Sequence, residues 1–208
     1  MLLNFADSGL YERQGKAVTN FEARLPAPES DLAQEITKDP YCFDFLTLTE
    51  TYQEKELEDA LTKNITRFLL ELGQGFAYVG RQIELTVGDD IIKPDLLFYH
   101  LRLRCYVVIE LKVTKFEPAY VGQLGTYVAA VNHQLRQETD TETLGLLVCK
   151  SKNEVLAQYA LESTKAPIGI SEYDLAKIYP KAIKSALPSI EEIEQEVQKL
   201  DAKKGCQI

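Results

Sequence analysis

Residues 93–112 read KPDLLFYHLRLRCYVVIELK, two runs of aromatic and β-branched residues joined by the link LRLR. Such runs are typical of neighbouring strands in the interior of a sheet. The stretch also carries Asp95, Glu110 and Lys112, and an isolated charge in an apolar sheet costs several kcal/mol unless it is paired or bound to a ligand. The segment therefore predicts a hairpin whose charged side chains serve a function.

The sequence around this hairpin indicates a mixed α/β domain. Apolar residues recur at helical spacing over residues 50–72, and Gly73 supplies a helix stop. Residues 75–87 alternate like a strand before the turn GDD, and residues 91–100 and 105–112 follow as two further strands. Five later elements are expected in the order helix, strand, helix, strand and helix, at residues 118–136, 144–150, 153–163, 167–173 and 187–200. Up to residue 173 the order is α, β, β, β, α, β, α, β.

Pro94 stands inside one of the expected strands. Proline has no amide hydrogen for the ladder, so this strand should be bulged, kinked or at an edge there. His100, Arg102 and Arg104 fall at the expected hairpin turn, where we expect all three at the surface.

Charge is distributed unevenly along the chain. The formal net charge of −9 argues by itself against a nucleic-acid partner, because phosphate binding normally needs a basic face. Residues 93–152, however, hold eight Lys and Arg against six Asp and Glu, so the acidic excess lies outside this middle segment. The middle of the chain can therefore present a basic rim.

Length and composition predict a cytoplasmic protein with one domain. We expect an N-terminal extension at residues 1–40, a domain at 41–187, and an acidic helix and tail at 188–208. No apolar run reaches the ~18 residues that a membrane span needs, and the start MLLNFADSGLYERQG has acidic residues too early for a signal peptide.

The four cysteines lie far apart, outside any CxxC or Cys/His pattern. They are Cys42, Cys105, Cys149 and Cys206. This scatter argues against a zinc site or a disulfide framework and fits a reducing cytosol. Cys105 and Cys149 are flanked by strand residues, so we expect both to pack in the core.

Asp95, Glu110 and Lys112 are spaced to meet on one face of the sheet. Side chains two residues apart on a strand point the same way, and a hairpin centred on residues 101–104 brings Asp95 beside them. Two carboxylates make an oxygen-rich site for Mg²⁺, which leaves positions for substrate phosphate. Lys112 would position the attacking water or stabilise the developing charge, as in a metal-dependent phosphodiesterase. Taken alone, these residues also suit a salt-bridged surface.

A family resemblance favours the metal site. Pro94-Asp95, fourteen residues, then Glu110-Leu111-Lys112 resembles the signature of the PD-(D/E)XK nucleases, whose common core has the order α, β, β, β, α, β. The strings DLLFYHLRLRCYVVIELK, FEPAYVGQL, LLVCKSKNEVLAQYAL and PIGISEY are very similar to the YhcG-type bacterial members. The resemblance covers about residues 40–187. It implies a restriction-endonuclease-like α/β fold, a mixed central sheet flanked by helices, with an additional αβ unit and a C-terminal helix.

The resemblance also assigns roles to residues. It makes Asp95 and Glu110 the metal ligands and Lys112 the catalytic lysine, with Mg²⁺ or Mn²⁺ as the cofactor. A third metal ligand often comes from the first core helix, where Glu58 is the candidate and Glu71 the reserve. Relatives typically carry a further N-terminal domain, which we expect to be absent from this chain.

Further contacts are implied on the second core helix and around it. Gln123 and Tyr127 match a QxxxY motif of many relatives, and as an i, i+4 pair they share a helix face. They would orient Lys112 or contact a phosphate. Four basic residues are candidates for contacts to the nucleic-acid backbone: Arg81, Lys115, Lys150 and Lys152.

These expectations combine into a Mg²⁺-dependent endonuclease-type hydrolase that cuts phosphodiester bonds of DNA, with RNA left open. It would act in a bacterial cytoplasm without membrane contact, as a homodimer or with a separate partner that carries the family's N-terminal domain. The alternative is a catalytically inactive module of the same fold that binds nucleic acid or assembles with a partner protein. The acidic net charge favours the alternative, whereas the intact Asp, Glu and Lys set favours the enzyme.

Overall fold

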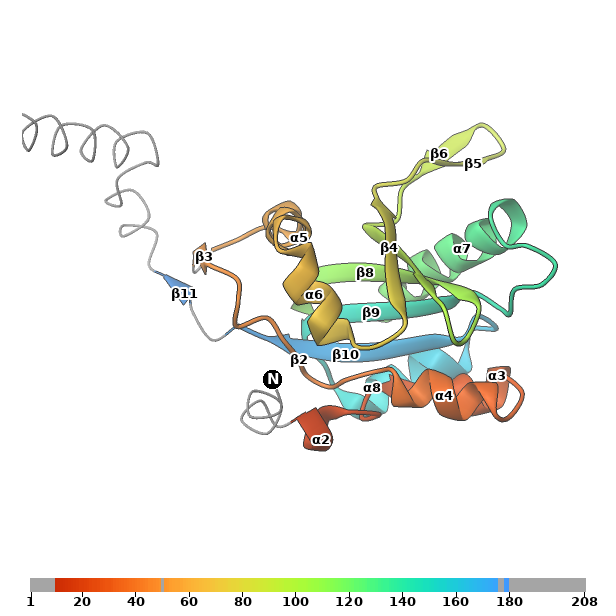
Figure 1. The fold of residues 1–208 in the computed structure, drawn as a ribbon, viewed down its shortest axis with the longest axis horizontal. Coiled ribbons are helices and arrows are strands. Elements are labelled where there is room, and N and C mark those ends of the chain that lie inside the picture. The colour runs from red at the N-terminus through yellow and green to blue at the C-terminus, as the bar shows by residue number, and fades with distance from the viewer. Residues whose placement is uncertain (1–9, 50, 176–177, 180–208) are drawn as a thin grey trace, which may run out of the picture.

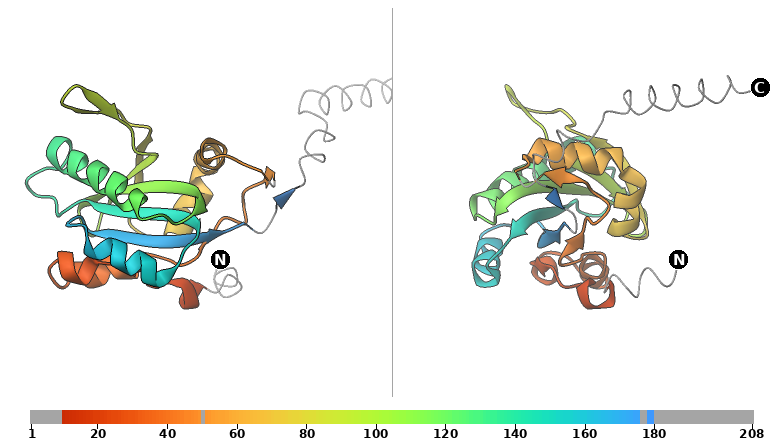
Figure 2. Two further views of the ribbon diagram at one scale, coloured as in Figure 1. Left: turned by 180° about the vertical axis from the view of Figure 1, so that it is seen from behind. Right: turned by 90° about the vertical axis from the view of Figure 1, so that its left-hand side faces the viewer.

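A computed structural model of the chain describes residues 10–49, 51–175 and 178–179. Figures 1 and 2 show a central sheet with helices on both faces, so the mixed α/β fold expected from the sequence is confirmed. No helix among the described residues is long and apolar enough to cross a membrane. The helix expected at residues 187–200 lies outside the described residues.

The main sheet is mixed. Its strands, in the order in which they lie side by side, are β1 (Val18–Thr19), β10 (Ile168–Asp174), β9 (Leu144–Ser151), β8 (Cys105–Lys115), β7 (Leu96–His100) and β4 (Phe76–Arg81). β10, β9 and β8 run parallel, whereas β7 and β4 continue the sheet in antiparallel pairing. Parallel neighbours need crossover connections, which here are α7 (Ala119–Gln134) and α8 (Glu154–Glu162). Short peripheral strands pair β2 (Tyr41–Cys42) with β10 and β3 (Leu48–Thr49) with β11 (Ile178–Tyr179).

Each face of the sheet has its own apolar core. α5 (Glu54–Lys63) and α6 (Ile65–Leu72) cover one face, in front of the sheet in Figure 1, and α7 and α8 cover the other. Along β7, Leu96 packs on the α5 side and Leu97 on the α7 side, because side chains of a strand alternate between faces. Cys149 belongs to the core under α7, and both it and Cys105 are buried, as predicted.

The same alternation decides which layer the charged residues of β8 face. Val108 packs in the core under α7. Glu110 and Lys112 follow it by two and four residues, so their side chains lie on the α7 side of the sheet. The fold thereby directs two ionisable groups toward the helix that carries Gln123 and Tyr127.

The antiparallel part contains β4, β7 and β8 in the regions where three consecutive strands are expected, with an added hairpin. β7 pairs with β8 from Leu96↔Ile109 to His100↔Cys105, so residues 101–104 form the turn, as expected. The strands expected at residues 75–87 and 91–100 are each interrupted. β5 (Leu85–Val87) and β6 (Asp90–Ile92) pair with each other and project from the body of the domain in Figure 1. Pro94 lies directly after this hairpin, at a break in the strand that its missing amide hydrogen explains.

The prediction of a single helix at residues 50–72 is wrong, because two helices are present there. α5 ends at Lys63 and α6 begins at Ile65, with Asn64 outside helical geometry between them. The side chain of Asn64 donates to the carbonyl oxygen of Ala60 at 3.0 Å, a local bond that competes with the helical pattern. The apolar period continues across this break, so periodicity alone could not reveal it.

Residues 10–40, expected as an extension, are folded against the sheet where the structure describes them. Their helices are α2 (Leu10–Arg13), α3 (Phe21–Arg24) and α4 (Glu29–Glu35). β1 pairs with β10, and Phe21 and Ala33 are fully buried in the core on the α5 side. Helices this short cannot display an apolar period, which explains why the sequence did not indicate them. The domain boundaries stay a prediction.

His100 is fully buried at the end of β7, so the expectation of a surface position is wrong. Its Nδ1 accepts the backbone amide of Leu103 at 3.1 Å, and its Nε2 lies 3.2 Å from the carbonyl oxygen of Gln74. Burial lowers the pKa of His100, and a neutral ring protonated on Nε2 satisfies both contacts. Arg102 and Arg104 are exposed in the turn, as expected.

Close packing of α7 on β9 yields a stability prediction. A Cβ at Gly145 would lie 2.9 Å from Cγ of Leu124 on α7 and 3.1 Å from Cγ1 of Ile168. We expect Gly145→Ala to lower the free energy of unfolding by about 1–3 kcal/mol through overpacking, measured by urea denaturation. Gly122 lies on α7, and a Cβ there would meet no atom within 4 Å, so Gly122→Ala should instead raise the free energy of unfolding by roughly 0.5–1 kcal/mol. A Gly145→Ala variant as stable as the wild type would contradict this packing.

Candidate active site

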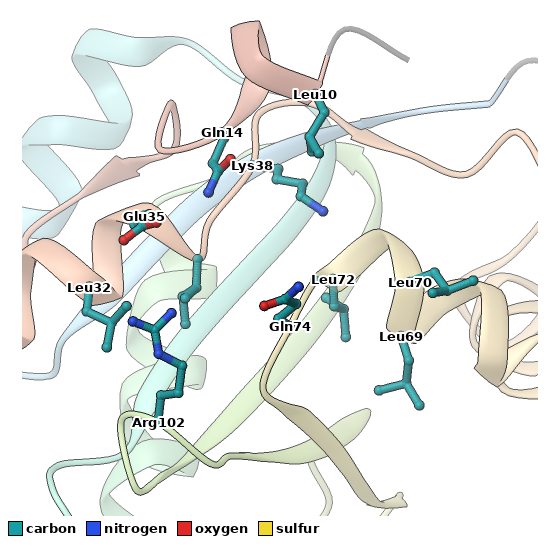
Figure 3. Close-up of a pocket in the computed structure, with 12 residues that line it drawn as sticks. Leu10, Gln14, Leu32, Glu35, Lys38, Leu69, Leu70, Leu72, Gln74 and Arg102 are labelled. Atoms are coloured by element: carbon teal, nitrogen blue, oxygen red, sulfur yellow. The ribbon is translucent and has the colours of Figure 1, made fainter. Parts of the chain in front are cut away.

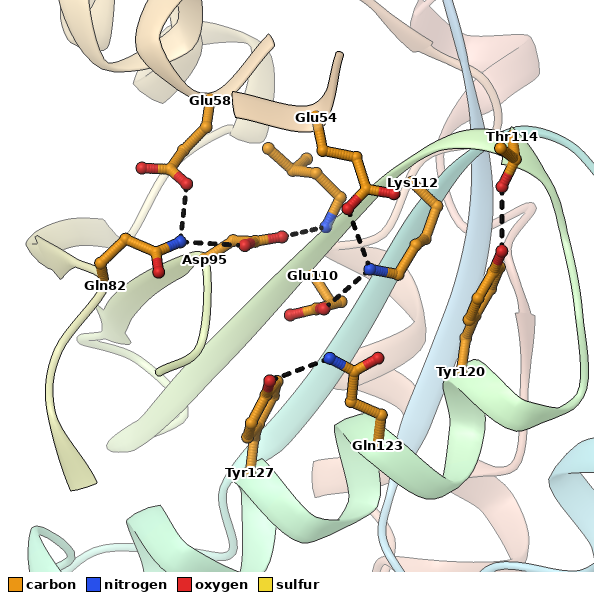
Figure 4. Close-up of polar contacts among 11 residues, drawn as sticks. Glu54, Glu58, Gln82, Asp95, Glu110, Lys112, Thr114, Tyr120, Gln123 and Tyr127 are labelled. Carbon is orange, nitrogen blue, oxygen red and sulfur yellow. Dashed lines mark hydrogen bonds and ion pairs between the residues drawn. The ribbon is translucent and has the colours of Figure 1, made fainter. Parts of the chain in front are cut away.

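Asp95, Glu110 and Lys112 lie together at the β7–β8 hairpin, as the strand register predicts (Figure 4). Lys112 Nζ is 3.1 Å from Glu110 Oε1. Asp95 immediately precedes β7, and its Oδ2 accepts the backbone amide of Leu111 at 2.9 Å. A backbone hydrogen bond from β8 thus fixes the Asp95 carboxyl group beside the two charged positions of that strand.

Glu110 is the most deeply buried carboxyl group of this cluster. The residue is 2% exposed, and its Oε2 is buried without a hydrogen-bond partner among the described residues. Burial, followed by the charge of Asp95, raises the pKa of Glu110 to about 7, although Lys112 opposes the shift. A buried oxygen without a partner marks a position where an added cation or donor would be stabilised.

Lys112 is held between two carboxylates and an aromatic ring. Besides Glu110, its Nζ lies 3.2 Å from Oε2 of Glu54 in the first turn of α5, and 5.3 Å from the ring centre of Tyr120 on α7. Burial by itself would lower the pKa of Lys112, but Glu110 and Glu54 together raise it. The side chain is therefore an ammonium at neutral pH, suited to stabilise negative charge rather than to accept a proton.

Asp95 and Glu58 are bridged by one side-chain amide. Gln82, the residue after β4, donates from Nε2 to Glu58 Oε2 at 2.7 Å and to Asp95 Oδ1 at 3.0 Å. Burial is the largest cause of the raised pKa of both carboxyl groups. The structure therefore places Glu58 of α5 beside Asp95, while its role as a metal ligand stays a prediction.

Gln123 and Tyr127 approach the cluster from α7. Gln123 Nε2 donates to Tyr127 Oη at 2.9 Å, and Figure 4 shows both side chains on the side of Glu110 and Lys112. Burial raises the pKa of Tyr127, and the charge of Glu110 adds to this shift. The hydrogen bonds that orient Lys112 come from Glu54 and Glu110, so contact with a substrate phosphate is the role left for the Gln123–Tyr127 pair as a prediction.

The cluster has far more negative than positive charge. Its four carboxyl groups are Glu54, Glu58, Asp95 and Glu110. Lys112 pairs with Glu54 and Glu110, and Glu58 has a longer ion pair with Arg81 at 3.7 Å. Carboxylate oxygens are the ligands that Mg²⁺ and Mn²⁺ prefer, so the donor set and the unpartnered oxygen of Glu110 fit a divalent cation. Within the described ranges, no three His, Cys, Asp or Glu side chains already form a metal cage. Asp95 and Glu110 could hold such a cation, with water or substrate oxygens completing its shell.

Two residues expected at the site lie in ion pairs elsewhere. Glu71, the reserve ligand, accepts from Arg13 at 2.7 Å and from the backbone amide of Cys42 at 2.8 Å, so it joins α6 to the N-terminal segment. The Lys152 side chain is 4% exposed and paired with Asp39. This ion pair joins Lys152 to the N-terminal segment, away from the carboxylate cluster, and its contact to a nucleic-acid backbone stays a prediction.

The other basic candidates lie at the surface. Lys115 and Lys150 are exposed at the ends of the neighbouring parallel strands β8 and β9, and neither makes an ion pair with a described residue. Arg81 is 45% exposed but is paired with Asp59 and Glu58. Lys115 and Lys150 are therefore better placed than Arg81 to meet a phosphate backbone.

A cavity of about 550 Å³ lies away from the cluster (Figure 3). Leucines of α2, α4 and α6 line it, with Lys38 and Arg102 among its polar residues. No member of the carboxylate cluster borders this cavity. The candidate active site is thus not part of this cavity.

Sequence reasoning missed Glu54 and Gln82. Glu54 stands in the charge-dense stretch TETYQEKELED, where no acidic residue is distinguished by composition. Its one signal is the i, i+4 spacing to Glu58, which places both on one face of the helix. Gln82 belongs to no motif, and its role follows only from the contacts of the folded chain.

Glu110 provides a pH-dependent prediction for the metal-free protein. Its folded-state pKa of about 7 exceeds the ordinary value of 4.5, so between these pH values the folded state binds more protons than the unfolded state. The contribution of Glu110 to the free energy of unfolding is therefore present below pH 4.5 and lost as the pH rises through 7. We expect Glu110→Gln to remove this loss, at most about 3 kcal/mol, in denaturation curves with EDTA at pH 5 and pH 8.

The exposed Glu138 offers a matched control for this measurement. Glu138→Gln removes the same charge from the surface and should leave the pH dependence of the wild type unchanged. Equal pH dependence in the wild type and in Glu110→Gln would contradict the raised pKa of Glu110.

Two solved structures align at low identity. A repair endonuclease from Pyrococcus abyssi is 20% identical with a TM-score of 0.38, over 62% of this chain and 50% of that chain. The apo form of EndoMS is 22% identical with a TM-score of 0.39, over 62% of this chain and 48% of that chain.

A curated relative and a family match are more specific. "Putative nuclease YhcG" of Escherichia coli (strain K12) is 36% identical over 154 residues, which are 74% of this chain and 41% of the relative. This chain thus spans about two fifths of the length of that relative. The family described as YhcG PDDEXK nuclease domain matches residues 34–188, which contain Asp95, Glu110 and Lys112. The chain therefore belongs to the YhcG PDDEXK nuclease domain family.

Proposed function

We propose that this chain is a divalent-metal-dependent nuclease that hydrolyses phosphodiester bonds of DNA, with Mg²⁺ or Mn²⁺ held by Asp95 and Glu110. The observation that carries the proposal is a pair of carboxyl groups, Asp95 at the start of β7 and Glu110 on β8, beside the ammonium group of Lys112; one oxygen of Glu110 is buried without a partner among the described residues. Such a buried arrangement destabilises a fold unless something neutralises it. A divalent cation, when bound, would neutralise the carboxylates and polarise a phosphoryl oxygen.

Three further residues would stabilise charge or bind the phosphate. Lys112, held by Glu54 and Glu110, presents an ammonium to the negative charge that develops on the phosphoryl group. Gln123 and Tyr127 offer amide and phenol hydrogens to a phosphate oxygen from the opposite side of the cluster.

Surface charge supports a polyanionic substrate in spite of the acidic net charge. Lys115 and Lys150 lie exposed at the ends of β8 and β9, beyond Lys112 on the same parallel pair. Exposed lysines at this position attract and align a phosphate backbone without reading its sequence. We propose DNA rather than RNA as this polymer.

A second candidate is a catalytically inactive module that binds nucleic acid or assembles with a partner protein. One observation favours it: Lys112 is already paired with two carboxylates, and among the residues that the structure describes no three acidic side chains converge into a cage. The net charge of −9 adds to this argument.

Substitution of Asp95 separates the two candidates. Asp95→Asn keeps an oxygen for the Leu111 amide but removes the ligand charge and turns an amide toward the Nε2 of Gln82. We expect metal-dependent cleavage to fall by about 100-fold or more, measured with supercoiled plasmid, single-stranded DNA and RNA in Mg²⁺, Mn²⁺ or EDTA. Circular dichroism should show that the fold persists.

Asp89→Asn, at the exposed turn between β5 and β6, is the matched control and should cleave like the wild type. A wild type that cuts none of the substrates and gives no heat of Mn²⁺ binding would favour the inactive module. Cleavage that survives both EDTA and Asp95→Asn would place the activity elsewhere.

A further inference from the structure

We infer that Gln82 is a positioning residue of the carboxylate cluster, which fixes Asp95 and Glu58 relative to each other for a cation. The inference rests on the proposed function, because it takes the cluster to be a cation site. It concerns a residue that lies outside the Asp, Glu-x-Lys and QxxxY patterns.

Gln82 contacts Asp95 with both its backbone and its side chain. Its backbone amide donates to the carbonyl oxygen of Asp95 at 3.1 Å, and its Nε2 donates to Asp95 Oδ1 at 3.0 Å and to Glu58 Oε2 at 2.7 Å. A primary amide nitrogen carries two hydrogens, so one nitrogen can serve both carboxyl groups at once. A single residue thus joins the start of β7 to α5.

The backbone at Gln82 is held in an unusual conformation. Its φ is 47°, in the left-handed region that residues other than glycine rarely adopt. The strand before it is also irregular, because the register of β4 against β7 shifts between Tyr78 and Gly80. Such irregularities re-aim a side chain at the end of a strand. Glycine would fit this conformation with less strain, so the glutamine is explained by the contacts of its side chain.

A neutral donor suits this position better than a charged one. The adjacent Arg81 directs its charge mainly to the exposed Asp59, with a longer contact to Glu58. The Gln82 amide holds Asp95 and Glu58 without cancelling their charge, and a carboxylate oxygen that accepts one hydrogen bond retains a lone pair for a metal. Gln82 therefore orders the two acidic groups and leaves their attraction for a cation in place.

The test is calorimetric titration of Mn²⁺ into the EDTA-treated, dialysed full chain. Removal of hydrogen-bond partners that orient metal ligands typically weakens metal affinity about 10–100-fold, and we expect Gln82→Gly and Gln82→Ala to fall in this range. Gln82→Gly suits the left-handed backbone, so its melting temperature should equal or exceed that of the wild type, which separates lost positioning from lost folding. Gln158→Ala, an exposed position on α8, should bind like the wild type.

The outcomes distinguish this inference from the proposed function. A wild type that binds Mn²⁺ together with a Gln82→Gly variant of equal affinity would overturn the positioning role and leave the metal site intact. A wild type without Mn²⁺ binding would overturn both. If Gln82 acts through Glu58, Gln82→Gly should weaken Mn²⁺ affinity less in a Glu58→Ala background than in the wild type. Additive losses of affinity in the double variant would contradict a route through Glu58.

Discussion

The burial of Glu110 beside a second carboxyl group, that of Asp95, is the constraint around which this structure is arranged. Asp95 directly precedes β7, which pairs antiparallel with the β8 strand of Glu110, and the charge of Asp95 disfavours ionisation of Glu110. The Leu111 amide and Lys112 offset part of this cost, and the pKa of Glu110, raised by burial first and by Asp95 second, shows that the compensation is incomplete. The strand pairing that builds the apolar core fixes the two groups together, so the sheet cannot relax the repulsion by moving them apart.

The cluster lies where the two helical layers meet around one end of β8. Glu54 and Glu58 come from α5, which packs on one core, whereas Gln123 and Tyr127 come from α7, which packs on the other. A change in how either layer packs therefore moves one half of the polar contacts relative to the other half. The absence of a side chain at Gly145 lets α7 approach β9, and through this approach the core helps to set the position of the Gln123–Tyr127 pair.

The sequence indicated most of the fold because the hairpin, α7 and β9 have strong local patterns. It also indicated that Asp95, Glu110 and Lys112 would meet, because strand alternation and a short turn leave little freedom. It failed where tertiary contacts override local pattern: at Asn64, where apolar spacing continues through a helix break, and in residues 10–40, whose elements are too short for a period. His100 illustrates the same limit. The sequence places it at a surface turn, whereas in the structure it is buried and both ring nitrogens contact backbone groups. Gln82 likewise follows from long-range packing that no spacing rule encodes, and Glu54 has only its i, i+4 spacing to Glu58 as a signal.

The excess negative charge of the cluster raises the question of why the fold tolerates it. A ligand that binds only the folded state raises the free energy of unfolding, and the gain is greatest when the site is already ordered and charged. Gln82, Leu111 and Glu54 supply order without cancelling the excess charge, because two are neutral donors and the third adds a carboxylate. A fully neutralised cluster would make a more stable metal-free domain but would have no affinity left for a cation. The excess charge and the ordered carboxyl groups therefore support the proposed divalent-ion site.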